Sequence, residues 1–150
     1  MIRKLLRKVF KRPATSARHE PALIPVERHG VSRDQLSPAA RKVCAVLQEK
    51  GFKAFVVGGA VRDLLIGQPP KDYDVATSAT PEEVRAAFRR SRIIGRRFKI
   101  VHVMSGPETI EVSTFRASQD AESAETDEHG RVLRDNVYGN LDEDATRRDF

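Results

Sequence analysis

Apolar and polar positions along this chain repeat first with a helical period and then with a strand period. Apolar side chains at helical spacing predict one helix from Pro38 to Lys50 and another that begins at Pro81 and ends near Arg90. Thr80 as N-cap, Pro81 at the first helical position and Glu83 as capping-box partner account for the start of the second helix.

The short apolar run between these helices predicts a strand, a turn and a further helix. Phe52 to Val57 is typical of a short buried strand, Gly58-Gly59 of a tight turn, and Ala60 to Ile66 of a helix that starts directly after it. A chain of 150 residues with these elements is sufficient for one domain with a sizeable core.

A hairpin is predicted further along the chain. The segments Phe98 to Met104 and Thr109 to Arg116 alternate as strands around Ser105-Gly106-Pro107-Glu108. Glu111 therefore lies on a strand. His102 is interpreted as a core or sheet-face residue rather than as a catalytic base.

Charge separates the first residues from the rest. Residues 1 to 18 hold seven basic residues and no acid, so the other residues carry 27 − 7 = 20 basic against 21 acidic side chains. Residues 1–21 form either a basic amphipathic helix, which would touch RNA or an anionic membrane surface, or a flexible leader, which is our prediction. The apolar run there is too short and too broken for a transmembrane span or a secretory signal.

Two other segments have a simple interpretation. Residues 117 to 130 hold several acids and no bulky apolar side chain, which predicts a mobile loop. Cys44 is the single cysteine, so no internal disulfide can form, and this agrees with a reducing cytoplasm.

Asp72 and Asp74 are the strongest candidates for chemistry. On a strand, carboxylates two positions apart point to the same face and can share a divalent cation. Magnesium prefers oxygen ligands and is held by one or two carboxylates together with substrate phosphates. Taken alone, such a pair is more often a solvated loop or a helix cap, but here it follows a glycine turn.

The glycine turn supplies a candidate phosphate site close to the two aspartates in the sequence. Gly58 and Gly59 let a phosphate approach the backbone, and the helix that follows directs N–H groups toward an anion. Arg62 adds a positive charge to this site. Two adjacent glycines usually mark a simple turn, and the spacing to Asp72 and Asp74 is what favours the functional interpretation.

These motifs carry a family resemblance. Residues 55–67 and 70–77 resemble the head-domain signature of the polymerase β-like nucleotidyltransferases, in the bacterial group of poly(A) polymerases and tRNA CCA-adding enzymes. CCA-adding relatives usually have Gly-x-x-His-Gly-Thr where this chain has Gly95-Arg96-Arg97-Phe98, which is similar to the bacterial poly(A) polymerases. Residues 110–116 and 142–150 match further motifs of the family, and the resemblance covers residues 22–150.

The resemblance implies a fold, an activity and partners. The fold would be α/β (α+β), with a mixed sheet flanked by helices, and residues 22–150 would be a catalytic head that lacks the neck, body and RNA-binding regions. The activity would be addition of AMP from ATP to RNA 3′ ends, in RNA polyadenylation and mRNA processing and decay, with Mg²⁺ or Mn²⁺ as cofactor. The isolated head is expected to be inactive or very weak.

The resemblance also assigns roles to single residues. Asp72 and Asp74 would hold the metal ions, Asp149 would be the third active-site acid, and Arg148 a nucleotide contact. The sequence alone treats Arg147-Arg148-Asp149 as part of an ordinary charged helix that Asn140 caps. Glu111 is either a third carboxylate near the metal or an edge-strand surface acid, and both interpretations stay open.

A second basic cluster precedes the hairpin. Its seven basic residues have no acid among them: Arg85, Arg89, Arg90, Arg92, Arg96, Arg97 and Lys99. Part of the cluster is explained by a solvated helix face. Arg96 and Arg97 lie in a turn between apolar strands, and we expect them to hold triphosphate or primer phosphate.

Two other functions remain as alternatives. One is a tRNA CCA-adding nucleotidyltransferase, which Gly95-Arg96-Arg97-Phe98 disfavours. The other is a non-catalytic RNA-binding module, which would be expected to have lost a metal carboxylate, although Asp72 and Asp74 are both present.

Overall fold

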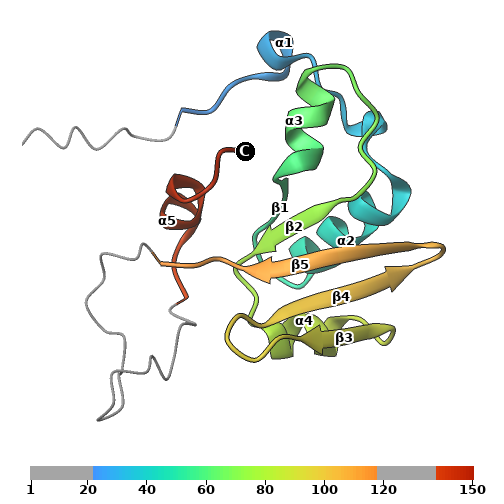
Figure 1. The fold of residues 1–150 in the computed structure, drawn as a ribbon, viewed down its shortest axis with the longest axis vertical. Coiled ribbons are helices and arrows are strands. Elements are labelled where there is room, and N and C mark those ends of the chain that lie inside the picture. Colours follow the sequence, from blue (N-terminus) through green and yellow to red (C-terminus); the bar gives the residue numbers. More distant parts are fainter. Residues whose placement is uncertain (1–21, 118–137) are drawn as a thin grey trace, which may run out of the picture.

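The computed structural model describes residues 22–117 and 138–150. The predicted leader and nearly all of the predicted acidic loop lie outside the described residues. Figure 1 shows a twisted sheet with helices behind it and a short helix, α5, beside its open face.

One mixed sheet forms the centre of the fold. Its five strands lie in the order β1-β2-β5-β4-β3. Strands β2 and β5 run parallel, and the other neighbouring pairs are antiparallel. The strand bounds are Ala54–Val57 for β1, Asp74–Thr77 for β2, Ser91–Ile94 for β3, Ile100–Ser105 for β4 and Glu108–Thr114 for β5. The predicted mixed sheet and the predicted hairpin are confirmed.

Helices cover one face of this sheet. The helix bounds are Val26–His29 for α1, Pro38–Glu49 for α2, Gly59–Leu65 for α3, Pro81–Ala87 for α4 and Leu141–Thr146 for α5, with a 3₁₀ turn, η2, at Arg33–Gln35. Both α2 and α4 pack against the sheet from the same side (Figure 1). Within residues 22–117 and 138–150, no helix combines the length and apolar character that crossing a bilayer requires.

The core lies between the sheet and these two helices. Val75, Val112 and Val101 are neighbours across three strands, and all three are buried. They meet Leu47 on α2 and Val84 on α4 in one apolar cluster. Fully burying a Val or Leu side chain contributes about 1.5–3 kcal/mol, so these rows fix the strand register firmly.

Local signals set the helix bounds. The Ser37 hydroxyl accepts the Ala40 N–H at 3.1 Å, and the predicted capping box of Thr80 and Glu83 is present. Helix α4 is shorter than predicted, because it ends at Ala87 and Phe88 is already extended. The chain must turn there into β3, and the Ser91 hydroxyl donates to the Phe88 carbonyl at 2.6 Å.

Cys44 lies on α2 and packs against the core, as its apolar neighbours predict. Burial raises the pKa of its thiol to about 11, against a smaller lowering by Arg33. The thiol is therefore overwhelmingly protonated at neutral pH and behaves as a small apolar group.

Candidate active site

A row of polar side chains crosses the face of the sheet opposite to the core. Asp74 on β2 pairs with Glu111 on β5, and Glu111 pairs with His102 on β4, which in turn lies opposite Arg92 on β3. Residues that pair directly share a face, while Val75 and Val112 point to the other side. The register that builds the core therefore aligns these charges on the open face.

Asp72 and Asp74 lie together, as predicted. Asp72 is exposed and lies in a bend two residues before β2, whereas Asp74 is half-buried at the first position of the strand. Tyr73 between them is buried, so the two carboxylates share one side of the chain.

Burial and neighbouring charges both act on the Asp74 carboxyl. Burial raises the pKa of Asp74 first, and the Glu111 and Asp72 carboxylates raise it further, while the Arg148 guanidinium lowers it. A carboxylate in this setting has excess negative charge around it. A bound cation would relieve this charge, so the donor set fits a hard divalent ion with oxygen ligands. Within residues 22–117 and 138–150, no group of three or more His, Cys, Asp or Glu side chains is arranged as a metal site.

Gly58 brings the turn against Asp74. Its φ of 73° lies in the region that favours glycine, and a Cβ there would approach the Asp74 Oδ2 atom to 3.2 Å. A Cβ on Gly59 would lie 3.4 Å from Nη2 of Arg62. The predicted strand, glycine turn and helix are present, and the turn abuts the carboxylates.

Two groups of the candidate phosphate site have partners within the chain. The Gly58 N–H donates to the Phe150 carbonyl at 2.9 Å, so in this arrangement it is engaged within the chain. The Arg62 guanidinium donates to Asp63 Oδ1 from Nε at 3.0 Å and from Nη2 at 2.8 Å. Arg62 is largely exposed, so its ion pair with Asp63 contributes little to the stability of the fold. The pair keeps the guanidinium near the glycine turn.

Glu111 is on the open face and is part of the row. Its carboxylate Oε2 lies 3.7 Å from Nε2 of His102. Glu111 also raises the pKa of Asp74, its register partner on β2. His102 is a partly exposed sheet-face residue, one of the two positions that the sequence predicted for it.

Arg148 is held beside the row by two partners. Its Nε donates to Asp144 Oδ2 at 2.6 Å, and its Nη2 donates to the Ser113 hydroxyl at 3.1 Å. Its positive charge lowers the pKa of Asp74.

The Arg147-Arg148-Asp149 run is not helical, contrary to the interpretation from sequence alone. Helix α5 begins with the predicted Asn140 cap but ends at Thr146, and Arg147 is its C-cap. Arg148 is instead drawn toward Ser113 on β5. Asp149 is exposed, and it is one residue from Phe150, whose carbonyl contacts the glycine turn.

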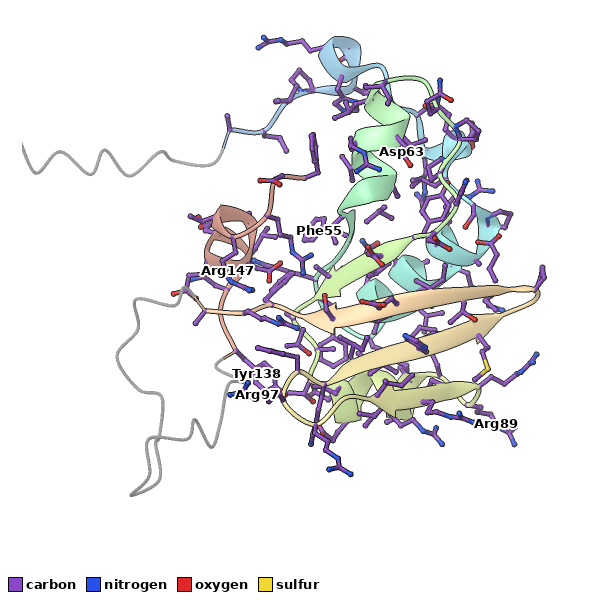
Figure 2. The ribbon with its side chains drawn as sticks, in the orientation of Figure 1. Phe55, Asp63, Arg89, Arg97, Tyr138 and Arg147 are labelled. Carbon is purple, nitrogen blue, oxygen red and sulfur yellow. The ribbon has the colours of Figure 1, made fainter. Side chains whose placement is uncertain are left out.

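Arg96 and Arg97 lie in the predicted turn between β3 and β4. Gly95 has a φ of 95°, and a Cβ there would collide with the Phe98 carbonyl oxygen, so the turn requires glycine. The basic cluster does not form one compact patch, because Arg89 and Arg97 lie toward opposite ends of β3 (Figure 2). Lys99 pairs with Glu82 on α4 at 3.5 Å.

Sequence reasoning assigned no role to Arg116, Ser113 or Asp144. Arg116 follows β5, and its guanidinium lies 4.5 Å from the centre of the Phe98 ring. Asp144 is 2% exposed and binds Arg148, four residues later in the chain. That i, i+4 spacing was a visible signal, but it does not reveal that the pair is buried.

The comparisons with known proteins agree with one family. The family model described as poly A polymerase head domain matches residues 54–150. Poly(A) polymerase I of Escherichia coli O157:H7 is 47% identical over 154 aligned positions, covering 96% of this chain and 33% of the relative. Poly(A) polymerase I of Haemophilus influenzae is 43% identical, covering 93% and 32%. The chain thus spans about a third of the length of these curated relatives.

CCA-adding enzymes are also similar. The enzyme of Lactobacillus helveticus is 40% identical, covering 74% of this chain and 27% of the relative. The crystal structure of the Bacillus stearothermophilus CCA-adding enzyme in complex with CTP is 36% identical, with a TM-score of 0.56 over 77% of this chain and 26% of that chain. This similarity confirms the predicted nucleotidyltransferase fold.

Proposed function

Because this chain belongs to the poly A polymerase head domain family, we propose that it provides the catalytic site for template-independent transfer of AMP from ATP to RNA 3′ ends. The 3′ oxygen of the RNA forms a bond to the α-phosphorus, the bond to the bridging oxygen breaks, and pyrophosphate leaves. The observation that carries this proposal is the location of Asp72 and Asp74 beside the Gly58 turn on the open face.

In this proposal Asp72 and Asp74 hold Mg²⁺ or Mn²⁺, and Glu111 is the adjacent carboxylate. When bound, the metal would neutralise charge on the phosphates and lower the pKa of the 3′ hydroxyl. The half-buried position of Asp74 at the strand start fixes its direction, which suits a reaction that depends on positioning.

The remaining site residues act on the nucleotide. Arg62 is held over the Gly59 turn and supplies a positive charge for the triphosphate. Arg148 is fixed beside Asp74 and contacts the nucleotide, with Asp149 as a further acid. Arg96 and Arg97 are assigned to phosphates of the triphosphate or the primer, and both are exposed.

ATP and RNA 3′ ends as substrates, a cytoplasmic location and the leader's role remain predictions. The relatives favour polyadenylation over CCA addition, because the two poly(A) polymerases match 96% and 93% of the chain and the CCA-adding enzyme matches 74%. The likeness to a CCA-adding enzyme bound to CTP is the observation that keeps the second function as an alternative.

The test uses the complete polypeptide that contains these residues. It is incubated with a non-tRNA primer or with a tRNA-like primer, with magnesium and with each nucleoside triphosphate alone or CTP and ATP together, beside an Asp72→Ala control. The proposal expects long ladders with ATP that disappear in the control. Addition of CTP and then ATP to tRNA-like ends alone would show CCA addition, and intact RNA binding without any transfer would favour the non-catalytic module.

A further inference from the structure

A small polar pocket adjoins the carboxylate row where β5 ends. It has a volume of about 200 Å³ and is lined by Ile100, Glu111, Ser113, Arg116, Arg147 and Arg148. This is several times the ~30 Å³ that one water molecule takes up in the liquid. Figure 2 shows Arg147 beside α5, and Arg116 and Arg148 line the same pocket.

One buried carboxylate, Asp144, organises the three arginines. Its Oδ2 accepts the Arg148 Nε–H at 2.6 Å, its Oδ1 accepts the Arg116 backbone N–H at 3.0 Å, and Oδ1 lies 3.9 Å from Nη1 of Arg147. A carboxylate that is 2% exposed is costly to bury unless it is paired and hydrogen-bonded, and Asp144 meets both conditions.

Two of the three guanidiniums also contact neutral side chains. Arg148 donates from Nη2 to the Ser113 hydroxyl at 3.1 Å, and Arg116 stacks on the Phe98 ring. A guanidinium has five N–H donors in a planar fork. The contacts with Asp144 and Ser113 use two donors of Arg148, which leaves others for a ligand in the pocket.

The charges at the pocket do not cancel. Three guanidiniums and one carboxylate, Glu111, line it, so basic side chains outnumber acidic ones in the lining. Burial first, and then the charges of Arg147 and Arg148, lower the pKa of Arg116. An anion in the pocket would relieve this repulsion, and phosphate is the anion whose geometry suits an arginine fork.

We propose that Arg116, Arg147 and Arg148 form one phosphate-binding pocket beside the catalytic carboxylates, and that Asp144 is the positioning residue that arranges it. The phosphate belongs to the nucleoside triphosphate or to the RNA backbone, and this choice of sources rests on the proposed function. Arg116 and Asp144 thereby gain roles in substrate binding.

The experiment compares three variants of the complete polypeptide. Arg116→Gln removes one cation, Asp144→Asn removes the organising charge while keeping the side chain's shape, and Asp142→Asn is the matched control on the exposed side of α5. Calorimetric titrations measure Kd for inorganic tripolyphosphate, for ATP with magnesium, and for a short RNA with a 3′ hydroxyl. Circular dichroism and thermal midpoints verify that each variant is folded.

We expect Arg116→Gln and Asp144→Asn each to weaken binding of one phosphate source by about tenfold or more, since hydrogen bonds to charged groups are the strong ones. Loss confined to tripolyphosphate and ATP would place the triphosphate in the pocket. Loss confined to RNA would place a backbone phosphate there. Unchanged Kd values for all three probes in folded Arg116→Gln protein would overturn the proposal.

Steady-state kinetics test the positioning role separately. Asp144→Asn should raise the KM of the substrate that the pocket binds, with a much smaller change in kcat. A fall in kcat at unchanged KM and Kd would show a merely structural role and would contradict the proposal. If polyadenylation itself fails, wild-type protein shows no transfer, yet the effects on tripolyphosphate binding remain measurable.

Discussion

The two faces of the sheet are built from the same strands but have opposite chemistry. On the face that α2 and α4 cover, Val75 and Val112 are buried side by side. On the open face, Asp74 and Glu111 occupy the adjacent register positions. Because strand side chains alternate, packing of the apolar row determines where the carboxylates lie. The covered face thus supplies stability, and the open face carries the candidate site.

The largest expected effect comes from placing a charge on the covered face. Val112→Asp buries a carboxylate among apolar side chains without a partner, and we expect the domain to unfold at neutral pH. Far-ultraviolet circular dichroism and urea titration measure this.

The matched control changes the neighbouring residue on the opposite face. Glu111→Gln should leave the free energy of unfolding within about 0.5 kcal/mol, because Glu111 is exposed. A Glu111→Gln protein as unstable as Val112→Asp would contradict the division of roles between the faces.

A smaller loss is expected from a cavity under the covered face. Leu47 is fully buried on α2, so Leu47→Ala should lower the free energy of unfolding by about 2–5 kcal/mol. Arg92→Ala on the open face should change it by less than about 0.5 kcal/mol. Chemical denaturation measures the free energy of unfolding of both variants. Equal losses of this free energy would contradict the division of roles between the two faces.

The smallest expected effect is a gain in stability, and it comes from replacing Asp74. The pKa of Asp74 is raised by folding, so the native state binds its proton more tightly than the unfolded state, and stability falls as pH rises through this pKa range. Without metal or nucleotide, Asp74→Asn should therefore be more stable than the wild type at neutral pH. The difference should vanish below the ordinary aspartate pKa of 3.8, where the carboxyl is protonated in both states, as thermal melts across pH will show.

The sequence predicted the elements that depend on local signals. The α2 start, the Thr80 capping box and the glycine turn follow from short-range hydrogen bonding and backbone preference, and all three are present. The pairing of Asp72 with Asp74 followed from strand alternation. The end of α4 was missed, because the need to turn into β3 overrides its helical pattern.

Long-range contacts were beyond prediction from sequence alone. No local pattern shows that Asp144 is buried against the Arg116 backbone, 28 residues away. The same holds for the contact between Ser113 and Arg148, 35 residues apart, which lies beyond the end of α5. The pairing of Glu111 with His102 depends on strand register, and it became visible with the fold.

The most direct test of the account is whether magnesium and ATP bind together at the open-face carboxylates. The thermal midpoints of the wild type and of Asp74→Asn are measured with magnesium alone, ATP alone and both. A ligand at about 100 times its Kd stabilises the folded state by about 2.7 kcal/mol, a shift that is easily resolved. The account predicts that both together raise the wild-type midpoint well beyond either alone, and that Asp74→Asn loses this synergy. An equal synergistic shift in Asp74→Asn would contradict it.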